Sequence, residues 1–427
     1  MPGLELDYKT STLKNGVRVI SARLESTAAV TALILVGTGS HYEKRELGGV
    51  SHFLEHLVFK GSKKYPNALK ISTILDGLGA QYNAFTDDEI TGFYIKTVKD
   101  KTEVALDVMS DFLKNPLFKT EEIERERGVI LEELRMYYDT PKRHVLDLFK
   151  EVLYGDQQAG AKIGGTEKTV SNIMPKDIKD YFKKQYGGGN IVAVFAGNIS
   201  HEEARKMAEK YIGDIPEGKP YKKPPVKDLN YGKKILIQNK KTDQTHIVVG
   251  SKAFGLVDER RYALDLLATI LGGGMSSRLF HEVRERRGLA YYVHAGADLG
   301  TDFGYFLARA GVANEKAPEA IKVVIEEFKK IAENPPAKTE VEKAKNHIEG
   351  STLLEIEASH AVAHELGVSE ILLKKIITPI EYIKKIKEIN AQDIVEVAGD
   401  IFKDGNIHLA LIGPHENDAE FEGLLRV

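Results

Sequence analysis

The chain has 427 residues, more than one hydrophobic core usually serves, so two or more domains are expected. Its composition, 42% hydrophobic and 29% charged, is that of a globular protein, and a formal net charge of −3 gives no reason to expect a nucleic acid or an anionic membrane as partner. The absence of cysteine excludes disulfide bonds, thiolate metal sites and a cysteine nucleophile, so any metal must be bound by His, Asp or Glu.

The first half of the chain combines strand and helix patterns. Asn15-Gly16 stands between apolar alternations over residues 13–20, which is typical of a tight hairpin turn. A β-rich run at 28–36 predicts a strand, and helical periodicity begins near Gly48-Gly49. The same patterns predict helices at 69–78, 102–113 and 121–138, a strand at 190–197 and a helix at 202–212.

The second half repeats this order of elements after a segment, 218–233, that is rich in Pro, Gly and Lys and is typical of a linker. The predicted strands are 234–238, 245–250, 290–297, 303–310 and 407–412, and the predicted helices begin at 259, 317 and 338. The matching order indicates an internal duplication, with domains at 1–217 and 234–427.

One predicted helix carries an H-x-x-E-H motif, His52-Phe53-Leu54-Glu55-His56. A turn of about 100° per residue places His52 and His56 on one face, within reach of one metal ion, with Glu55 beside them. Neutral imidazoles are zinc ligands, and a neighbouring carboxylate can accept a proton from water. The alternative is a helix that carries two histidines by chance, but its apolar neighbours predict burial, where unpaired ionisable groups would be costly. We therefore predict a zinc site with Glu55 as general base.

A third zinc ligand is expected from the helix at 121–138. On a helical wheel, Glu126 and Glu133 fall within the apolar stripe, whereas Glu132 falls outside it. Two carboxylates on a buried face need a cation or a histidine nearby. We predict Glu133 as the third ligand and Glu126 as the residue that orients an imidazole. The alternative is that both glutamates pair with Arg127 or with other basic residues.

These residues, in this order, resemble the pitrilysin and mitochondrial-processing-peptidase family, specifically its shorter prokaryotic members, over essentially the whole chain. Residues 52–61 resemble the family's zinc helix, and Glu133 stands where the third ligand is expected. The resemblance implies one zinc ion (Zn2+) per chain, supported by Glu126. It also implies an α+β fold of two homologous half-units, each a mainly antiparallel sheet with helices packed on it.

The resemblance further implies how substrate is bound. Residues 79–86 resemble the family's edge strand, which pairs with the substrate backbone. This implies Asn83 and Ala84 as substrate contacts, and Phe59 as a wall of the pocket after the scissile bond. The residues alone would be read as an ordinary half-buried strand without a function.

A segment of the second half, 271–291, resembles the one that carries the family's arginine–tyrosine pair, here Arg284 and Tyr291. Both can donate hydrogen bonds to a substrate carbonyl or a developing oxyanion. On the residues alone, Arg284 would be part of a solvated basic helix face. Larger members enclose a chamber with four half-units, so two half-units imply a homodimer in which Arg284 and Tyr291 of one chain complete the zinc site of the other.

We therefore expect a zinc-dependent metalloendopeptidase that hydrolyses peptides or unfolded segments, bound as an extended strand in a closable chamber. One alternative is a catalytically silent scaffold of the same fold, and another is one half of a hetero-oligomer that depends on its partner. The sequence shows no secretory signal and no stretch of the roughly 18 to 20 apolar residues that a membrane span needs. We expect a cytoplasmic protein without membrane or nucleic-acid partners.

Overall fold

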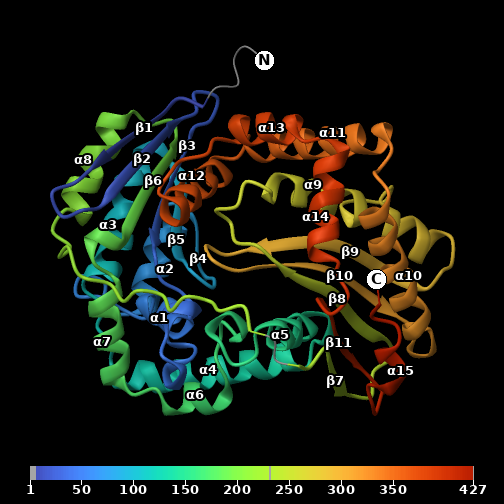
Figure 1. Cartoon of the computed structure of the whole chain (residues 1–427). Helices are drawn as coiled ribbons and strands as arrows, with labels where there is room; N and C mark the ends of the chain where they lie inside the picture. The colour runs from blue at the N-terminus through green and yellow to red at the C-terminus, as the bar shows by residue number, and fades with distance from the viewer. Residues whose placement is uncertain (1–5, 230–231, 427) are drawn as a thin grey trace. The chain divides into compact units, whose positions relative to one another are not determined.

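A computed structural model describes residues 6–229 and 232–426, which form two compact units (Figure 1). The first unit contains the chain up to Leu134 together with residues 162–224 and 353–381. The second contains residues 135–161, 225–352 and 382 onward. In the described parts of the chain, no helix combines the length and the apolar character that crossing a membrane requires.

The first unit is built on a six-stranded sheet with the order β1-β2-β6-β3-β5-β4. Its strands are β1 (Tyr8–Thr12), β2 (Arg18–Arg23), β3 (Ala29–Val36), β4 (Gln81–Thr86), β5 (Thr91–Val98) and β6 (Ile191–Gly197). Neighbouring strands are antiparallel, except for the parallel pair β2 and β6. The predicted hairpin turn joins β1 to β2, with Gly16 at φ +87°, and β4 lies at an edge of the sheet.

Both faces of this sheet are covered by helices, because successive side chains of a strand point to opposite faces. Ile34 and Ala193 belong to a core with α3 (Thr102–Lys114) and α8 (His201–Ile212), whereas Leu33 and Val194 belong to a core with α12 (Ser359–Leu373). Figure 1 shows α8 and α12 on opposite sides of the sheet. The remaining helices of this unit are α1 (Val50–Val58), α2 (Ala68–Gly77), most of α4 (Thr120–Tyr138), α6 (Glu167–Asn172) and α7 (Pro175–Gln185).

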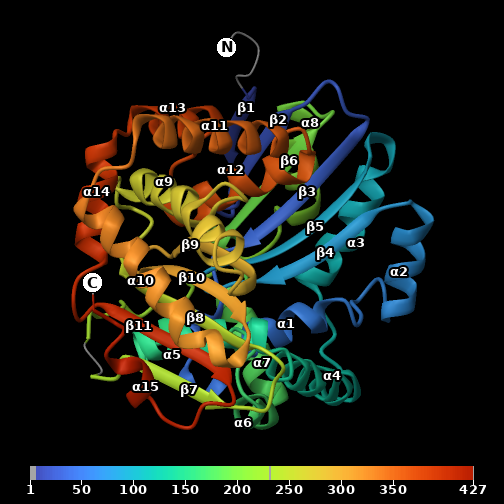
Figure 2. The same cartoon turned by 90° about the vertical axis from the view of Figure 1, so that its right-hand side faces the viewer.

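The second unit contains a five-stranded sheet with the order β7-β11-β8-β10-β9, with β9 at an edge (Figure 2). Its strands are β7 (Ile235–Asn239), β8 (Thr245–Ala253), β9 (Ala290–Leu299), β10 (Gly304–Val312) and β11 (Ile407–Gly413). The pair β7 and β11 is parallel, as is β2 and β6 in the first unit, and all other neighbours are antiparallel. The two sheets therefore share one topology over five strands, as the predicted duplication requires.

The helices of the second unit cover both faces of its sheet. One core includes α9 (Arg261–Gly272), α10 (Ala317–Glu333) and α14 (Ala391–Ile401), and another includes α5 (Pro141–Tyr154). The unit also contains most of α11 (Lys338–Glu355) and α13 (Pro379–Glu388), and the short α15 (Ala419–Glu422).

Each compact unit takes one helix from the other half of the sequence. Helix α5 follows α4 in the first half, yet it packs on β11 and β8 of the second unit. Helix α12 follows α11 in the second half, yet it packs on β6 and β3 of the first unit. Neither α5 nor α12 is among the helices predicted from the sequence, and the division at 217 and 234 stays a prediction about the repeat in the sequence.

Candidate metal centre

The first helix, α1, presents the H-x-x-E-H motif on its one polar face. It starts after Gly49, whose φ of +95° is left-handed and whose Cβ, if present, would lie 2.6 Å from a carbonyl oxygen of Gly164. This position therefore favours glycine. The buried side chains are Val50, Ser51, Phe53, Leu54, Leu57 and Val58. The other face of the helix carries His52, Glu55 and His56, which are only partly buried.

The structure brings His52, His56 and Glu133 together, as predicted. The Nε2 atom of His52 lies 3.7 Å from Oε2 of Glu133, and the Nε2 atom of His56 lies 3.4 Å from the same oxygen. The two imidazole rings are 4.8 Å apart between centroids. One potential ligand atom from each of the three residues lies within 4.8 Å of the others. Two imidazole nitrogens and one carboxylate oxygen, converging at this spacing, fit the donor set of a catalytic zinc ion.

Helix α4 supplies both predicted glutamates from one face. Glu126 is 3% exposed, Glu133 is partly buried and Glu132 is exposed, so the inner and outer positions match the helical wheel. The guanidinium of Arg127 pairs with Glu124, donates to the carbonyl oxygens of Val170 and Ile173, and lies 5.4 Å from the Phe53 ring. Arg127 thus joins α4 to its surroundings through groups other than Glu126.

Glu126 contacts His56 at Nδ1, the ring nitrogen opposite to the one that faces Glu133. Oε2 of Glu126 lies 3.3 Å from Nδ1 of His56, and its Oε1 lies 2.8 Å from Nζ of Lys60. Burial acts to raise the pKa of Glu126, but the hydrogen bonds from His56 and Lys60 outweigh it and lower the pKa. A carboxylate that accepts from Nδ1–H leaves Nε2 of the same ring free to bind a metal. No sequence pattern indicated this role of Lys60.

The two histidines have opposite electrostatic environments. Burial, followed by the proximity of His56, lowers the pKa of His52 to about 4, so its imidazole is neutral at neutral pH. Burial also acts to lower the pKa of His56, but hydrogen bonds with Glu126 and Glu133 outweigh it and raise the pKa to about 9. The carboxylates of Glu126 and Glu133 therefore favour a positive charge at His56, and a metal ion bound by His56 and Glu133 would replace the proton of His56.

Glu55 lies beside the histidines and is held by the end of β4. The Thr86 hydroxyl donates to Oε2 of Glu55 over 2.6 Å. Burial raises the pKa of Glu55, and this hydrogen bond only partly opposes the rise. A carboxylate with a raised pKa is a stronger base at neutral pH. The role of Thr86 could not be predicted from the sequence, because no local pattern indicates which helix the end of a strand meets.

The predicted substrate-binding residues lie next to this group. Asn83 and Ala84 are on the edge strand β4, where Asn83 is exposed and Ala84 is buried. The Phe59 ring follows α1 and packs against Phe112 at 4.8 Å and against Tyr82 at 6.4 Å between centroids. An edge strand can pair with an extended peptide, so the position of β4 agrees with the expected mode of binding.

Arg284 and Tyr291 are close to each other in the second unit. Arg284 is in a π-helical turn, Phe280–Glu285, and its guanidinium lies 4.8 Å from the Phe280 ring and 5.7 Å from the Tyr291 ring. Tyr291, near the start of β9, is 77% exposed. The metal ligands belong to the first unit and this pair to the second, so the role of the pair stays a prediction.

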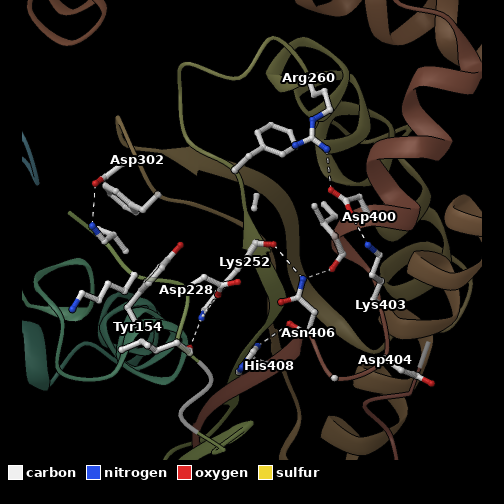
Figure 3. A pocket seen from close by; sticks show the side chains of 18 residues that line it. Tyr154, Asp228, Lys252, Arg260, Asp302, Asp400, Lys403, Asp404, Asn406 and His408 are labelled. Atoms are coloured by element: carbon white, nitrogen blue, oxygen red, sulfur yellow. Dashed lines mark hydrogen bonds and ion pairs between the residues drawn. The ribbon is translucent and has the colours of Figure 1, made fainter.

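A polar cleft of about 700 Å³ in the second unit is lined by none of the predicted site residues (Figure 3). Three of its basic side chains pair with aspartates: Lys252 with Asp228, and Arg260 and Lys403 with Asp400. Each of these cations therefore has an acidic partner among the residues that line the cleft.

Comparison with known proteins identifies relatives over nearly the whole chain. Residues 18–167 match the family model described as Insulinase (Peptidase family M16), and residues 172–348 match the one described as Peptidase M16 inactive domain. An uncharacterized zinc protease of Streptomyces coelicolor is 33% identical over 95% of this chain and 89% of its own length. Another, from Bacillus subtilis, is 33% identical over 96% of this chain and 99% of its own.

Two solved structures have the same fold. The crystal structure of a protease from Helicobacter pylori has a TM-score of 0.89 at 23% identity, covering 96% of this chain and all of that one. A peptidase M16 inactive domain from Pseudomonas fluorescens has a TM-score of 0.89 at 21% identity, covering 96% of this chain and 99% of that one. The predicted fold, an α+β protein of two similar half-units, is thereby confirmed.

Proposed function

We propose that this chain, which belongs to the M16 (insulinase) family of peptidases, is a zinc-dependent endopeptidase that hydrolyses peptides or unfolded protein segments. The observation that supports it most is the convergence of His52, His56 and Glu133 on one point, with Glu55 alongside. The match of residues 172–348 to the family's inactive domain agrees with the absence of a second H-x-x-E-H motif from the sequence.

Each residue of this site would have a separate role in hydrolysis. A zinc ion held by His52, His56 and Glu133 would supply a Lewis acid at this point. Glu55, held by Thr86, would accept a proton from the attacking water and deliver it to the nitrogen of the leaving amine. Glu126 would keep His56 oriented with its Nε2 toward the ion.

Substrate would bind to β4 as an added strand. Main-chain groups at the edge of a sheet can pair with an extended peptide of any sequence. Asn83 and Ala84 would contact the bound substrate, and Phe59 would contact the side chain after the scissile bond. Binding through the backbone suits peptides and unfolded segments, because a folded protein rarely offers a free strand.

We further propose a homodimer in which two copies enclose a closable chamber. Arg284 and Tyr291 of one copy would donate hydrogen bonds to the substrate carbonyl at the zinc site of the other. The support is that both donors stand together in the second unit, with the phenol exposed. Replacing both residues should then reduce hydrolysis without reducing zinc content, and mixing that variant with a variant inactive at Glu55 should restore part of the activity.

The proposal is tested with the chain purified alone. Metal analysis should find one zinc ion per chain, and cleavage of a quenched fluorescent peptide should stop when a chelator removes it. Glu55→Gln should keep the zinc and lose hydrolysis, and full activity in this variant would rule out Glu55 as the base. A chain that binds zinc but cleaves no member of a peptide library would instead support the scaffold alternative.

A further inference from the structure

The start of the metal helix α1 is capped by a carboxylate from outside the helix. Glu43 lies six residues before Gly49 and is 4% exposed. The amide of Gly49 donates to its Oε2 and the amide of Ser51 to its Oε1, both over 2.7 Å. The first amides of a helix have no partner within the helix, and a glycine at the cap position has no side chain to serve them. Glu43 serves two of them at once.

The ionised form of Glu43 is the one that suits this position. Burial raises the pKa of Glu43 to about 8 against the hydrogen bonds from the amides of Ser51 and Gly49, so the carboxylate that serves both amides predominates above that pH. Only a carboxylate offers an acceptor oxygen to each of the two amides, and the positive end of a helix dipole favours a negative charge. Protonation would place a hydrogen on one carboxyl oxygen, and this O–H donor would face the N–H donor of a backbone amide.

The same turn of α1 is also held through the side chain of Ser51. The Ser51 hydroxyl lies 3.0 Å from the Tyr181 hydroxyl of α7, which lies 2.8 Å from the Thr38 hydroxyl. Gln185, at the end of α7, donates to the Thr38 hydroxyl over 2.9 Å. These polar groups are buried, so the first turn of α1 sits in a fixed network and not in solvent.

The two metal-binding histidines differ in what orients them. His56 is held through Nδ1 by Glu126. Among the described residues, Nδ1 of His52 is buried and has no hydrogen-bond partner. Gly164 packs beside this ring, since a Cβ there would lie 2.9 Å from Leu134 and 3.7 Å from Nδ1 of His52. The direction of His52 thus depends on packing and on the backbone of its own turn, which begins with the amides that Glu43 binds.

We infer that Glu43 is a positioning residue for the metal site, which clamps the first turn of α1 so that His52 stays aligned with His56 and Glu133. The inference rests on the proposed function, because it assigns Glu43 a role in zinc binding. The two amides that Glu43 binds belong to the backbone at the start of α1, not to a ligand side chain. Loss of Glu43 should therefore affect zinc affinity and kcat more than KM.

The test is Glu43→Gln, which keeps size but can accept from only one of the two amides. Zinc affinity, measured above pH 8 by competition with a chromophoric chelator, should fall roughly tenfold, the lower end of what loss of a ligand-supporting group costs. In the zinc-free protein, hydrogen exchange at the first turn of α1 should become faster. Glu327→Gln is the matched control: Glu327 is also 4% exposed but lies in α10 of the second unit, where it pairs with Lys330 at 2.6 Å.

The outcomes separate this inference from the proposed function. Absence of zinc from the wild-type chain would refute the proposed function and the inference with it. Wild-type zinc binding with unchanged zinc affinity in Glu43→Gln would refute the inference alone, as would an equal loss of affinity in Glu327→Gln. Glu43→Asp retains the charge but is one methylene shorter, so it should fall between wild type and Glu43→Gln; if Glu43→Gln does not fold, wild-type affinity in Glu43→Asp would overturn the inference.

Discussion

Replacing Thr86 by valine should slow hydrolysis without weakening substrate binding. The change removes one hydroxyl, which donates to Oε2 of Glu55 over 2.6 Å, and leaves a side chain of nearly the same shape in β4. A hydrogen bond to a charged acceptor contributes about 1.5 to 3 kcal/mol. If that contribution orients Glu55 in the transition state, its loss lowers kcat roughly tenfold to 100-fold, because about 1.4 kcal/mol corresponds to a factor of ten in rate.

The assay is steady-state cleavage of a quenched fluorescent peptide, with zinc content measured for each variant. KM should stay near the wild-type value, because the backbone of β4 is unchanged. Thr86→Ser keeps the hydroxyl and should keep most of kcat. Thr31→Val is the matched control, since the Thr31 hydroxyl is buried against that of Ser359, 2.9 Å away, and its loss should reduce stability but not kcat. A wild-type kcat in Thr86→Val would refute the reasoning, and so would an equal loss in Thr31→Val.

Three further outcomes are expected. Lys60→Met removes the cation 2.8 Å from Glu126 and should lower zinc affinity roughly tenfold, whereas Lys60→Arg should retain it; equal affinities would contradict the role of Lys60. Zinc at 100 times its dissociation constant should stabilise the fold by about 2.7 kcal/mol, seen as a higher Tm, and this shift should disappear in Glu133→Gln. Burial lowers the pKa of His408 to about 4, so the stability that its neutral form contributes is complete above pH 6.5 and is lost as the pH falls toward 4, by about 2 kcal/mol at pH 5. The decrease in Tm between pH 7.5 and pH 5 should therefore be smaller in His408→Gln, and an unchanged decrease would exclude His408 as a source.

The residues of the metal centre could be predicted because their relations are local. His52, Glu55 and His56 share one face of a helix by their spacing alone, and Glu126 and Glu133 share one face of another. Helix periodicity acts over a few residues, so it can be read without knowing where the helix lies. The third ligand required more than periodicity. The helical wheel placed Glu133 on the buried face of its helix, and the family resemblance implied that this face meets the histidine helix.

The supporting contacts were decided by the tertiary structure. Thr86 reaches Glu55 across 31 positions of sequence, and Lys60 reaches Glu126 across 66. Glu43 is closer in sequence to α1, but it caps the helix only because the intervening turn folds back on it. No periodic pattern encodes such contacts, which depend on how separately formed elements pack.

The placement of α5 and α12, each of which packs on the sheet of the other half of the sequence, also depends on the tertiary structure. Many of the strands and helices of each half could be predicted from runs and periods of apolar residues, because these reflect how one element buries one face. Which sheet a helix covers is a different question, since an apolar face can be buried equally well against either of two similar sheets. The sequence alone indicated the ligand faces and many of the elements, and the packing of the whole chain decided which of them meet.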